Sequence, residues 1–316
     1  MSGKDTAKVG FAISGYFGGG LASANAGDPD TKALQYSNLS NAHFPNSNYS
    51  SSGGLNVGFS LDVLFGKKRN MELSLGLLYL YSKGTANYDG FHAEYEAQDA
   101  MGNPFRRLLT ATHASETLSF GNVLIPLLFK YSTNPDKKLG AFFQLGPVLS
   151  VSATSSGTMN ATMDFEAVYH YDAVNNKYTY SPTTAPGDWV LTRQAVAAEL
   201  APNQSVDDYF AQHYARGYYV GLDRSQTGKA AKISYKIGGG MQIRAGGVYR
   251  ASKIVSILFG ATVIVLSNGQ NTHTYTPISA SNDLNTISLS NFMQGTSSLL
   301  TMQAGINIGL QVRIIK

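Results

Sequence analysis

The sequence contains no cysteine, so disulfides, thiolate metal ligands and cysteine nucleophiles are excluded together. It has no apolar run of about 18 residues or more, which excludes a membrane-spanning helix. Charged residues make up only 14% of the 316 residues, which is low for a soluble protein. The formal net charge of +4 is spread along the chain without a basic helix, so nothing in the sequence calls for a nucleic acid partner.

Glycine and aromatic residues are abundant instead, with 33 Gly, 19 Tyr and 15 Phe, which favours an all-β fold with many short connections. Residues 55–65 show the clearest strand pattern, because every second residue is apolar. Leu55, Val57, Phe59, Leu61, Val63 and Phe65 fall on one face. The same alternation predicts eight strands, near residues 8–18, 54–65, 71–82, 116–132, 139–152, 231–247, 254–266 and 298–315.

The apolar alternation within each predicted strand spans roughly 9 to 15 residues, as a tilted strand needs to cross a membrane. The apolar faces carry no charged residue, whereas the opposite face of 298–315 is small and polar, as a narrow lumen requires. Aromatic residues near the strand ends fit the two interfaces of a membrane. They are Phe17, Phe65, Tyr79, Tyr81, Phe129, Tyr131 and Tyr235.

The connections alternate strictly between short and long. Three are turns of about five residues, and the others are predicted loops near 19–53, 83–115, 153–230 and 267–297. This pattern predicts one domain over residues 1–316, an eight-stranded antiparallel up-and-down transmembrane β-barrel of the bacterial outer membrane. Both termini and the short turns would be periplasmic and the long loops extracellular, the third loop containing short helices near 190–200 and 205–217.

Pro126 and Pro147 lie inside predicted strands with neighbours on both sides, so we expect a β-bulge near each. In 116–132 the apolar phase shifts from Leu118 and Phe120 to Val123, which predicts one extra residue around Gly121. The run 238–240 of three glycines lies in mid-strand, where a kink or close packing is expected rather than phosphate binding.

Residues 122–131, a short turn containing proline and residues 139–147 together resemble the paired-strand signature of the PorT-like outer-membrane barrels of Bacteroidota. The signature covers about 30 residues, and the wider plan of eight strands is also similar to that family. The loops here, especially the third, are longer than in that family. The resemblance implies that the protein acts in the cell envelope as an accessory or assembly partner of other proteins. It does not imply a particular chemical activity.

Charged residues on the inward faces gather near the periplasmic strand ends and predict an ion network in that half of the lumen. They are Lys8, Asp62, Glu72, Lys130, Arg244 and Arg313. Because eight strands enclose a space that side chains fill, we expect a packed interior. A narrow channel is the alternative, with Lys232, Lys236 and Gly240 lining its upper half.

The third loop is domain-sized, and function is expected there. Its aromatic residues are candidates for a partner or ligand surface, although they could instead pack the loop upon itself. The candidates are Trp189, Tyr209, Phe210, Tyr214, Tyr218 and Tyr219.

All six histidines fall in predicted loops. None has the HxxxH or HExxH spacing of metal ligands on one helix, so no metal, cofactor or catalytic residue is assigned.

The leading hypothesis is a non-enzymatic anchor or accessory subunit of a larger outer-membrane assembly, in contact with lipid, lipopolysaccharide and other outer-membrane proteins. A surface-binding protein or adhesin that recognises a glycan or protein through its loops is the alternative. A narrow channel or an envelope enzyme ranks below both. Residues 1–8 lack an apolar signal segment, so we expect a processed or recombinant chain, which the intact mass of the native protein would test.

Overall fold

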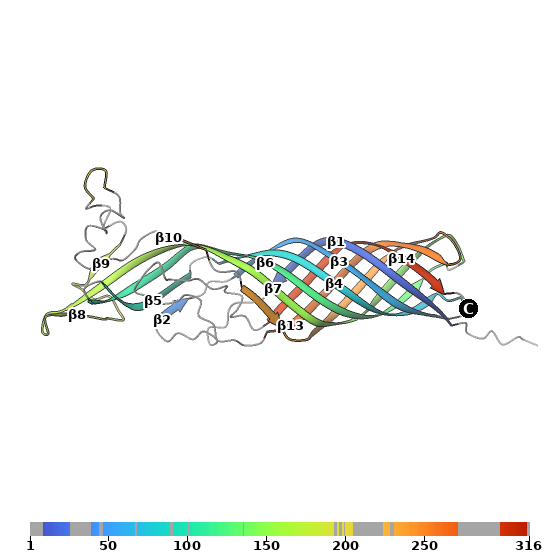
Figure 1. Ribbon diagram of the computed structural model, residues 1–316, viewed down its shortest axis with the longest axis horizontal. Helices are drawn as coiled ribbons and strands as arrows, with labels where there is room; N and C mark the ends of the chain where they lie inside the picture. The colour runs from blue at the N-terminus through green and yellow to red at the C-terminus, as the bar shows by residue number, and fades with distance from the viewer. Residues whose placement is uncertain are drawn as a thin grey trace, which may run out of the picture.

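The computed structural model describes residues 9–25, 39–43, 47–66, 68–88, 91–99, 102–134, 136–192, 195, 198, 200–204, 224–227, 231–270 and 298–314. These residues form 14 strands, and all of their pairings are antiparallel (Figure 1). The prediction of an all-β antiparallel fold is therefore confirmed. The described part of the chain holds no helix long and apolar enough to span a bilayer.

Eight long strands pair with one another in a ring (Figure 1). They are β1 (Gly10–Asn25), β3 (Ser47–Phe65), β4 (Met71–Tyr88), β6 (Pro104–Ser132), β7 (Leu139–Asp172), β12 (Gly238–Arg250), β13 (Val255–Gly269) and β14 (Ser298–Ile314). Each pairs with the next one, and β14 pairs back onto β1, with Phe11 opposite Ile314. Pairing on both sides satisfies the backbone polar groups of these strands, which lipid could not do.

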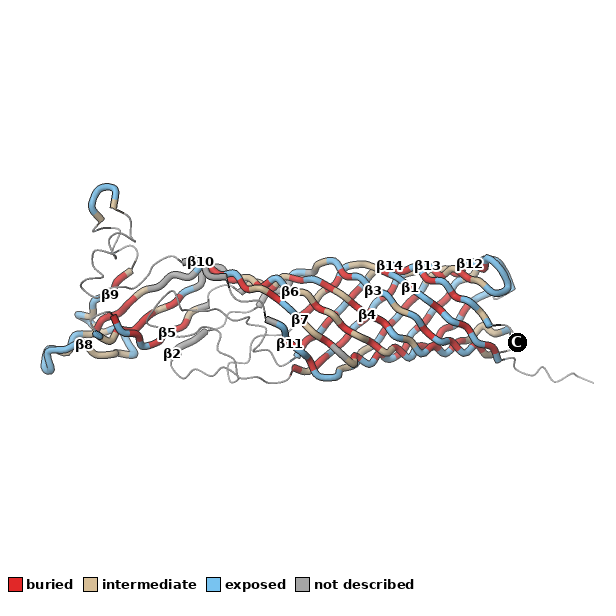
Figure 2. Tube along the Cα trace, in the orientation of Figure 1, coloured by how far each residue is buried: buried red, intermediate tan, exposed pale blue. Residues whose placement is uncertain are grey.

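Buried and exposed residues alternate along the strands of the ring (Figure 2). In β14, Ile308 and Leu310 are 58% and 49% exposed, while Asn307 and Gln311 are buried. The outward row of β4 is apolar from Leu73 up to Tyr81, and its first charged residue is Lys83. The outer surface is thus apolar and polar groups are buried inside, the reverse of a water-soluble protein and the pattern of a wall that faces lipid.

Short turns join the strands at one end of the ring, where the two described chain ends also lie (Figure 1). The turn between β3 and β4 contains two residues with positive φ, Gly66 at 91° and Arg69 at 53°. The turn between β6 and β7 contains Asn134 at φ 48°. Glycine and asparagine tolerate this left-handed conformation best, so the composition of these turns supports their tight geometry.

Beyond the opposite end of the ring, β6 and β7 continue as a long ribbon (Figure 1). We define the ribbon as residues 104–113 of β6 and 162–172 of β7, which pair with each other up to Arg106 opposite Val168, together with the short strands beside them. Those strands are β5 (Phe91–Gln98) on β6, β2 (Leu39–His43) on β5, and β10 (Arg224–Thr227), β9 (Trp189–Leu191) and β8 (Lys177–Thr179) on β7.

The ribbon corrects the predicted loops 83–115 and 153–230, because strand structure reaches Tyr88 in β4, begins at Pro104 in β6 and reaches Asp172 in β7. The lipid-facing row of apolar residues ends where the strand leaves the membrane level. The hydrogen bonds between strand backbones do not depend on apolar side chains, so the strands continue beyond the last lipid-facing residue. The alternation therefore marked the apolar band and not the ends of the strands.

The predicted bulges are corrected as well. Pairing is interrupted opposite Pro126 in β4 and opposite Pro147 in β6, but the register resumes unchanged in both places. The register shift of this region lies between Val123 and Leu124, where β7 supplies the extra residue, Val151. Consequently β6 keeps one phase from Ala114 to Ser132, and Leu118 and Phe120 point inward with 1% exposure instead of outward.

The sixth predicted strand, 231–247, is divided in two. Ala231–Tyr235 forms β11, which pairs with β7, and β12 begins only at Gly238. The break changes the phase, so Ile233 and Tyr235 are buried and Tyr235 does not belong to an outer aromatic girdle. Its hydroxyl instead lies 3.0 Å from Ser155 Oγ.

Of the helix predicted near 190–200, Val190 and Leu191 belong instead to β9. Ala195 and Ala198 are helical, and the Ala195 N–H donates to Thr192 Oγ1 at 3.1 Å, as at a helix N-terminus. The helix predicted near 205–217 lies outside the described residues.

Candidate functional site

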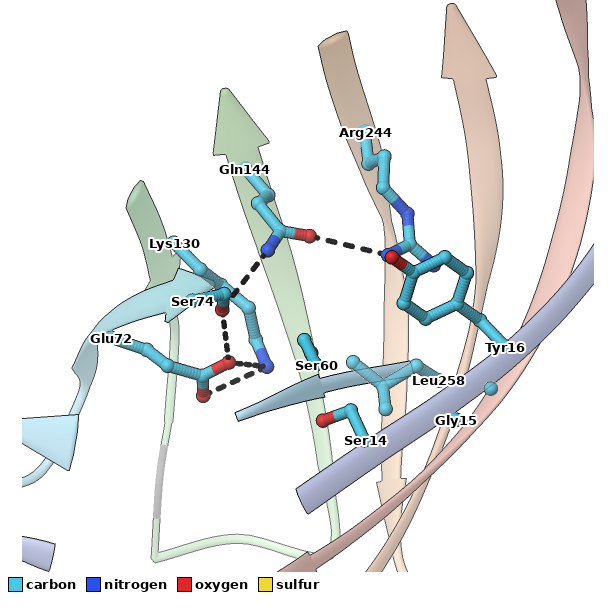
Figure 3. A pocket seen from close by; sticks show the side chains of 11 residues that line it. Ser14, Gly15, Tyr16, Ser60, Glu72, Ser74, Lys130, Gln144, Arg244 and Leu258 are labelled. Carbon is cyan, nitrogen blue, oxygen red and sulfur yellow. Dashed lines mark hydrogen bonds and ion pairs between the residues drawn. The ribbon is translucent and has the colours of Figure 1, made fainter. Parts of the chain in front are cut away.

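Two carboxylates, Asp62 and Glu72, accept hydrogen bonds in the lumen near the turn end of the ring, and Figure 3 shows Glu72 with its partner Lys130. Lys130 Nζ donates to both oxygens of Glu72, at 2.9 and 3.0 Å. Gln311 Nε2 donates to Glu72 at 2.9 Å and to Asp62 at 3.2 Å, so it links the two acids. The hydroxyls of Ser14 and Ser60 also donate to Asp62. We call this set the lumen ion network.

Arg244 lies next to this network, at the level of Tyr16 (Figure 3). Its guanidinium carbon is 4.3 Å from the centroid of the Tyr16 ring, a cation–π contact. It donates to Asn307 at 3.2 Å and to Gln144 at 3.5 Å, and Gln144 donates onward to Ser74 at 3.3 Å. The remaining cavity, of about 10 Å³, has room for about one water.

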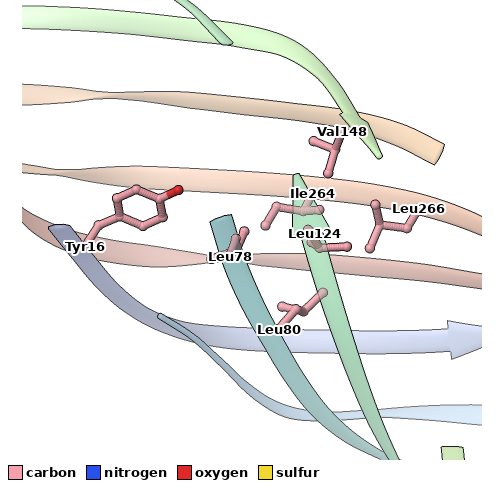
Figure 4. Close-up of a cluster of buried hydrophobic side chains, with 7 residues drawn as sticks. All are labelled: Tyr16, Leu78, Leu80, Leu124, Val148, Ile264 and Leu266. Carbon is pink, nitrogen blue, oxygen red and sulfur yellow. The ribbon is translucent and has the colours of Figure 1, made fainter. Parts of the chain in front are cut away.

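Apolar side chains fill the next level of the lumen, away from the short turns (Figure 4). They are Tyr16, Leu78, Leu80, Leu124, Val148, Ile264 and Leu266, and none is more than 7% exposed. We call this cluster the apolar plug. The plug shares this level with buried polar side chains, because Asn56 lies opposite Leu80 and donates to Gln303 at 3.2 Å, and together these groups leave the level closely packed.

The apolar plug was missed in the sequence, where a polar lumen face was expected. The available signal was residues 77–80, which are apolar on both faces of β4: Leu77 and Tyr79 point outward and Leu78 and Leu80 inward. A strand that is apolar on both faces meets hydrocarbon on both sides, here lipid outside and the plug inside.

The six predicted lumen charges do not all meet. Asp62 and Glu72 share Gln311, Glu72 pairs with Lys130, and Arg244 joins them through Gln144. Arg313 is half-buried at the turn end, and its Nε has no hydrogen-bond partner within the described chain. Lys8 lies outside the described residues.

The tip of the ribbon contains a second cluster of buried polar groups. Phe105, Arg106 and Arg107 are consecutive in β6 and all buried, so both faces of the ribbon are covered there. Arg106 pairs with Glu94 of β5 at 3.1 Å and also donates to the carbonyl of Pro182 and the hydroxyl of Thr184. It therefore ties the segment after β8 to the ribbon.

Arg107 is buried on the other face of the tip. Its Nη1 donates to the Tyr95 hydroxyl at 2.9 Å, and its guanidinium lies 5.1 Å from the centroid of Phe105. Tyr169 of β7 stacks on Phe105 with centroids 5.1 Å apart, and Trp189 lies 5.7 Å from Tyr169. These contacts make the tip a packed unit of aromatic rings around arginine.

Trp189 is the one predicted surface residue that the structure describes, and it is 43% exposed. It packs on Tyr169, as expected if the loop packs upon itself. Tyr209, Phe210, Tyr214, Tyr218 and Tyr219 lie outside the described residues.

His170 Nδ1 lies 2.5 Å from Asp188 Oδ1 at the tip. Burial raises the pKa of Asp188, but hydrogen bonds from the Ala185 N–H and from His170, with the charges of His170 and Arg106, hold this pKa below its usual value. The Asp188 carboxylate is thus charged at neutral pH, and it fixes the 185–188 turn to β7.

Four histidines expected in loops lie instead in strands: His43 in β2, His92 in β5, His113 in β6 and His170 in β7. Across the described ranges, no three His, Asp or Glu side chains come together as metal ligands would.

A ring of antiparallel strands with an apolar outer wall and a polar interior defines an integral β-barrel of the outer membrane. The profile of the outer membrane protein beta-barrel domain family matches residues 30–195, more than half of the chain. The chain belongs to this family.

No curated protein matches the sequence. Among solved structures, the outer membrane protein OprG from Pseudomonas aeruginosa is similar at a TM-score of 0.27 and 8% sequence identity, with 96% of each chain covered. Because this TM-score is low, the likeness does not define the geometry or function of the present barrel.

Proposed function

We propose that this protein is a non-enzymatic outer-membrane anchor whose eight-stranded barrel holds the ribbon on the outside of the cell, as an accessory subunit of a larger outer-membrane assembly. The resemblance to PorT-like barrels implies the same kind of role. Other outer-membrane proteins would be its partners, and phospholipid and lipopolysaccharide would surround the barrel.

The observation that carries this proposal is the continuity of β6 and β7, which are 29 and 34 residues long. A strand needs about 9 to 11 residues to cross a membrane, so most of each strand serves another purpose. The extra length ends in a packed tip. Ordering the tip costs conformational entropy, and a loop with no role beyond joining two strands has no need to be ordered in this way. The sealed lumen supports an anchor in preference to a channel, and Lys232 and Lys236, the candidates for a cationic pore lining, are exposed.

The orientation is testable with single cysteines, because the chain contains none. Val174 in the tip is 93% exposed, and Lys137 lies in the short turn between β6 and β7. We expect Val174→Cys to react with a large polyethylene glycol maleimide on intact cells, and Lys137→Cys to react only after the outer membrane is permeabilised. The reverse pattern would place the ribbon in the periplasm and contradict the proposal.

The accessory role is tested by removing the ribbon without disturbing the barrel. Tyr88 lies opposite Ala114, and Gly157 lies opposite Ala231, so residues 89–113 and 158–230 can each be replaced by an Asn-Gly hairpin turn. The trimmed barrel should still insert and show heat-modifiable gel mobility. Proteins that co-purify with the intact chain from native membranes should be lost.

The same pair of proteins addresses the alternative of a surface-binding protein or adhesin, which the partial exposure of Trp189 and Tyr171 at the tip favours. An adhesin would purify without a membrane partner, and binding of cells or glycans would disappear on trimming. A trimmed barrel that keeps its membrane partners would contradict a role for the ribbon in assembly.

A further inference from the structure

Basic residues concentrate at the end of the barrel that carries the short turns. Residues 66–70, 133–138 and 250–254 hold seven Lys or Arg and one acid, Asp136, whereas the whole chain holds 24 basic and 20 acidic residues. We define the basic rim as the described turn residues whose cationic side chains are exposed or half-exposed. They are Lys68, Arg69, Lys137, Lys138 and Lys253.

The basic rim begins where the lipid-facing wall ends. Lys138 directly precedes Leu139, which is 64% exposed, and Lys253 directly precedes Ile254, which is 44% exposed. An exposed apolar residue beside a lysine is the arrangement of a membrane interface, where the aliphatic stem covers hydrocarbon and the ammonium reaches the headgroups. The lysines therefore stand at the level of lipid phosphates.

Basic turns also surround the barrel. β4 pairs with β6 and β7 pairs with β12, so the three turns join six consecutive strands of the ring. A docked protein would contact one side, whereas lipid contacts every side. Asp136 neutralises little of this charge, because its 3.9 Å pair with Lys68 is mostly exposed to solvent.

We propose that the basic rim binds the phosphates of anionic phospholipids in the leaflet beside the short turns and selects phosphatidylglycerol over zwitterionic lipid. Each lysine ammonium attracts negatively charged lipid headgroups, and the lysines are distributed around the barrel, so lipids on several sides feel this attraction. The interaction depends on membrane insertion but not on the role of the ribbon.

The test uses the full chain in phosphatidylcholine vesicles, with spin-labelled phosphatidylglycerol or phosphatidylcholine as the probe of wall contact. We expect the wild type to prefer the anionic probe by about fivefold, the effect of roughly one basic residue at an anionic surface. The preference should fall towards one in Lys137→Gln/Lys138→Gln/Lys253→Gln and should also weaken with added salt.

The matched control removes three exposed lysines away from the rim, as Lys177→Gln/Lys232→Gln/Lys236→Gln. It should keep the wild-type preference, and gel mobility checks that both variants fold. The milder Lys138→Gln/Lys253→Gln should lose part of the preference. An unchanged preference in the rim variant, or an equal loss in the control, would overturn the proposal, while trimming the ribbon should leave the lipid preference intact.

Discussion

Glu72→Gln is expected to lower the free energy of unfolding by about 3 kcal/mol, because it leaves the Lys130 ammonium buried without a counter-charge. Lys130 is only 3% exposed, and Glu72 is its ion-pair partner among the described residues. The measurement is urea unfolding in lipid vesicles, followed by heat-modifiable gel mobility. The fluorescence of Trp189, the single tryptophan, should be unchanged in the absence of urea because it reports the tip.

Glu72→Gln/Lys130→Gln removes both charges and should regain most of the loss, because neither partner is then left as an isolated buried ion. Asp136→Asn is the control, since it breaks an exposed ion pair with Lys68 and should change stability by less than about 0.5 kcal/mol. If the double variant were as unstable as Glu72→Gln, the loss would not come from the uncompensated lysine.

Gly240→Ala is expected to cost about 3 kcal/mol or to prevent the barrel from forming. A β-carbon at this inward position would lie 1.8 Å from the backbone oxygen of Val265 on β13. A backbone oxygen cannot rotate away as a side chain can, so the pairing of β12 with β13 would have to open. The close packing predicted for the 238–240 run is confirmed at Gly240.

The neighbouring Gly239 supplies the control. It points outward, and a β-carbon there would have its nearest contact at 3.5 Å, the Val148 oxygen. Gly239→Ala should therefore be neutral or stabilise the protein by up to about 1 kcal/mol, because alanine lowers the conformational entropy of the unfolded chain. Equal insertion yields and equal urea midpoints for the two variants would show that close packing at Gly240 does not limit stability.

The residues that face lipid were the most predictable part of this molecule. A charge such as Lys83 is costly within the hydrocarbon and acceptable just beyond it, so the membrane imposes a period-two pattern that is visible in one sequence. The same reasoning failed at Tyr235, because the break at Lys236 and Ile237 reverses the phase and nothing in the apolar pattern marks that break.

The lumen and the tip were less predictable for different reasons. Gln311 was not identified as the link between Asp62 and Glu72, because its contacts depend on which strands become neighbours when the sheet closes. Arg106 and Arg107 fell within the predicted loop 83–115, and their burial follows only once β5, β7 and the segment after β8 surround them. These contacts are long-range in sequence and have no local pattern.

The unbroken course of β6 and β7 also has a mechanical consequence. Their mutual pairing extends from Ser132 opposite Phe142 near the turn to Arg106 opposite Val168 in the tip, with two register shifts and one short interruption. A force that pulls the tip away from the membrane acts along these strands, so it loads many backbone hydrogen bonds in shear at once instead of opening them one by one. The ribbon would then transmit tension to the lipid-embedded wall as a stiff tether.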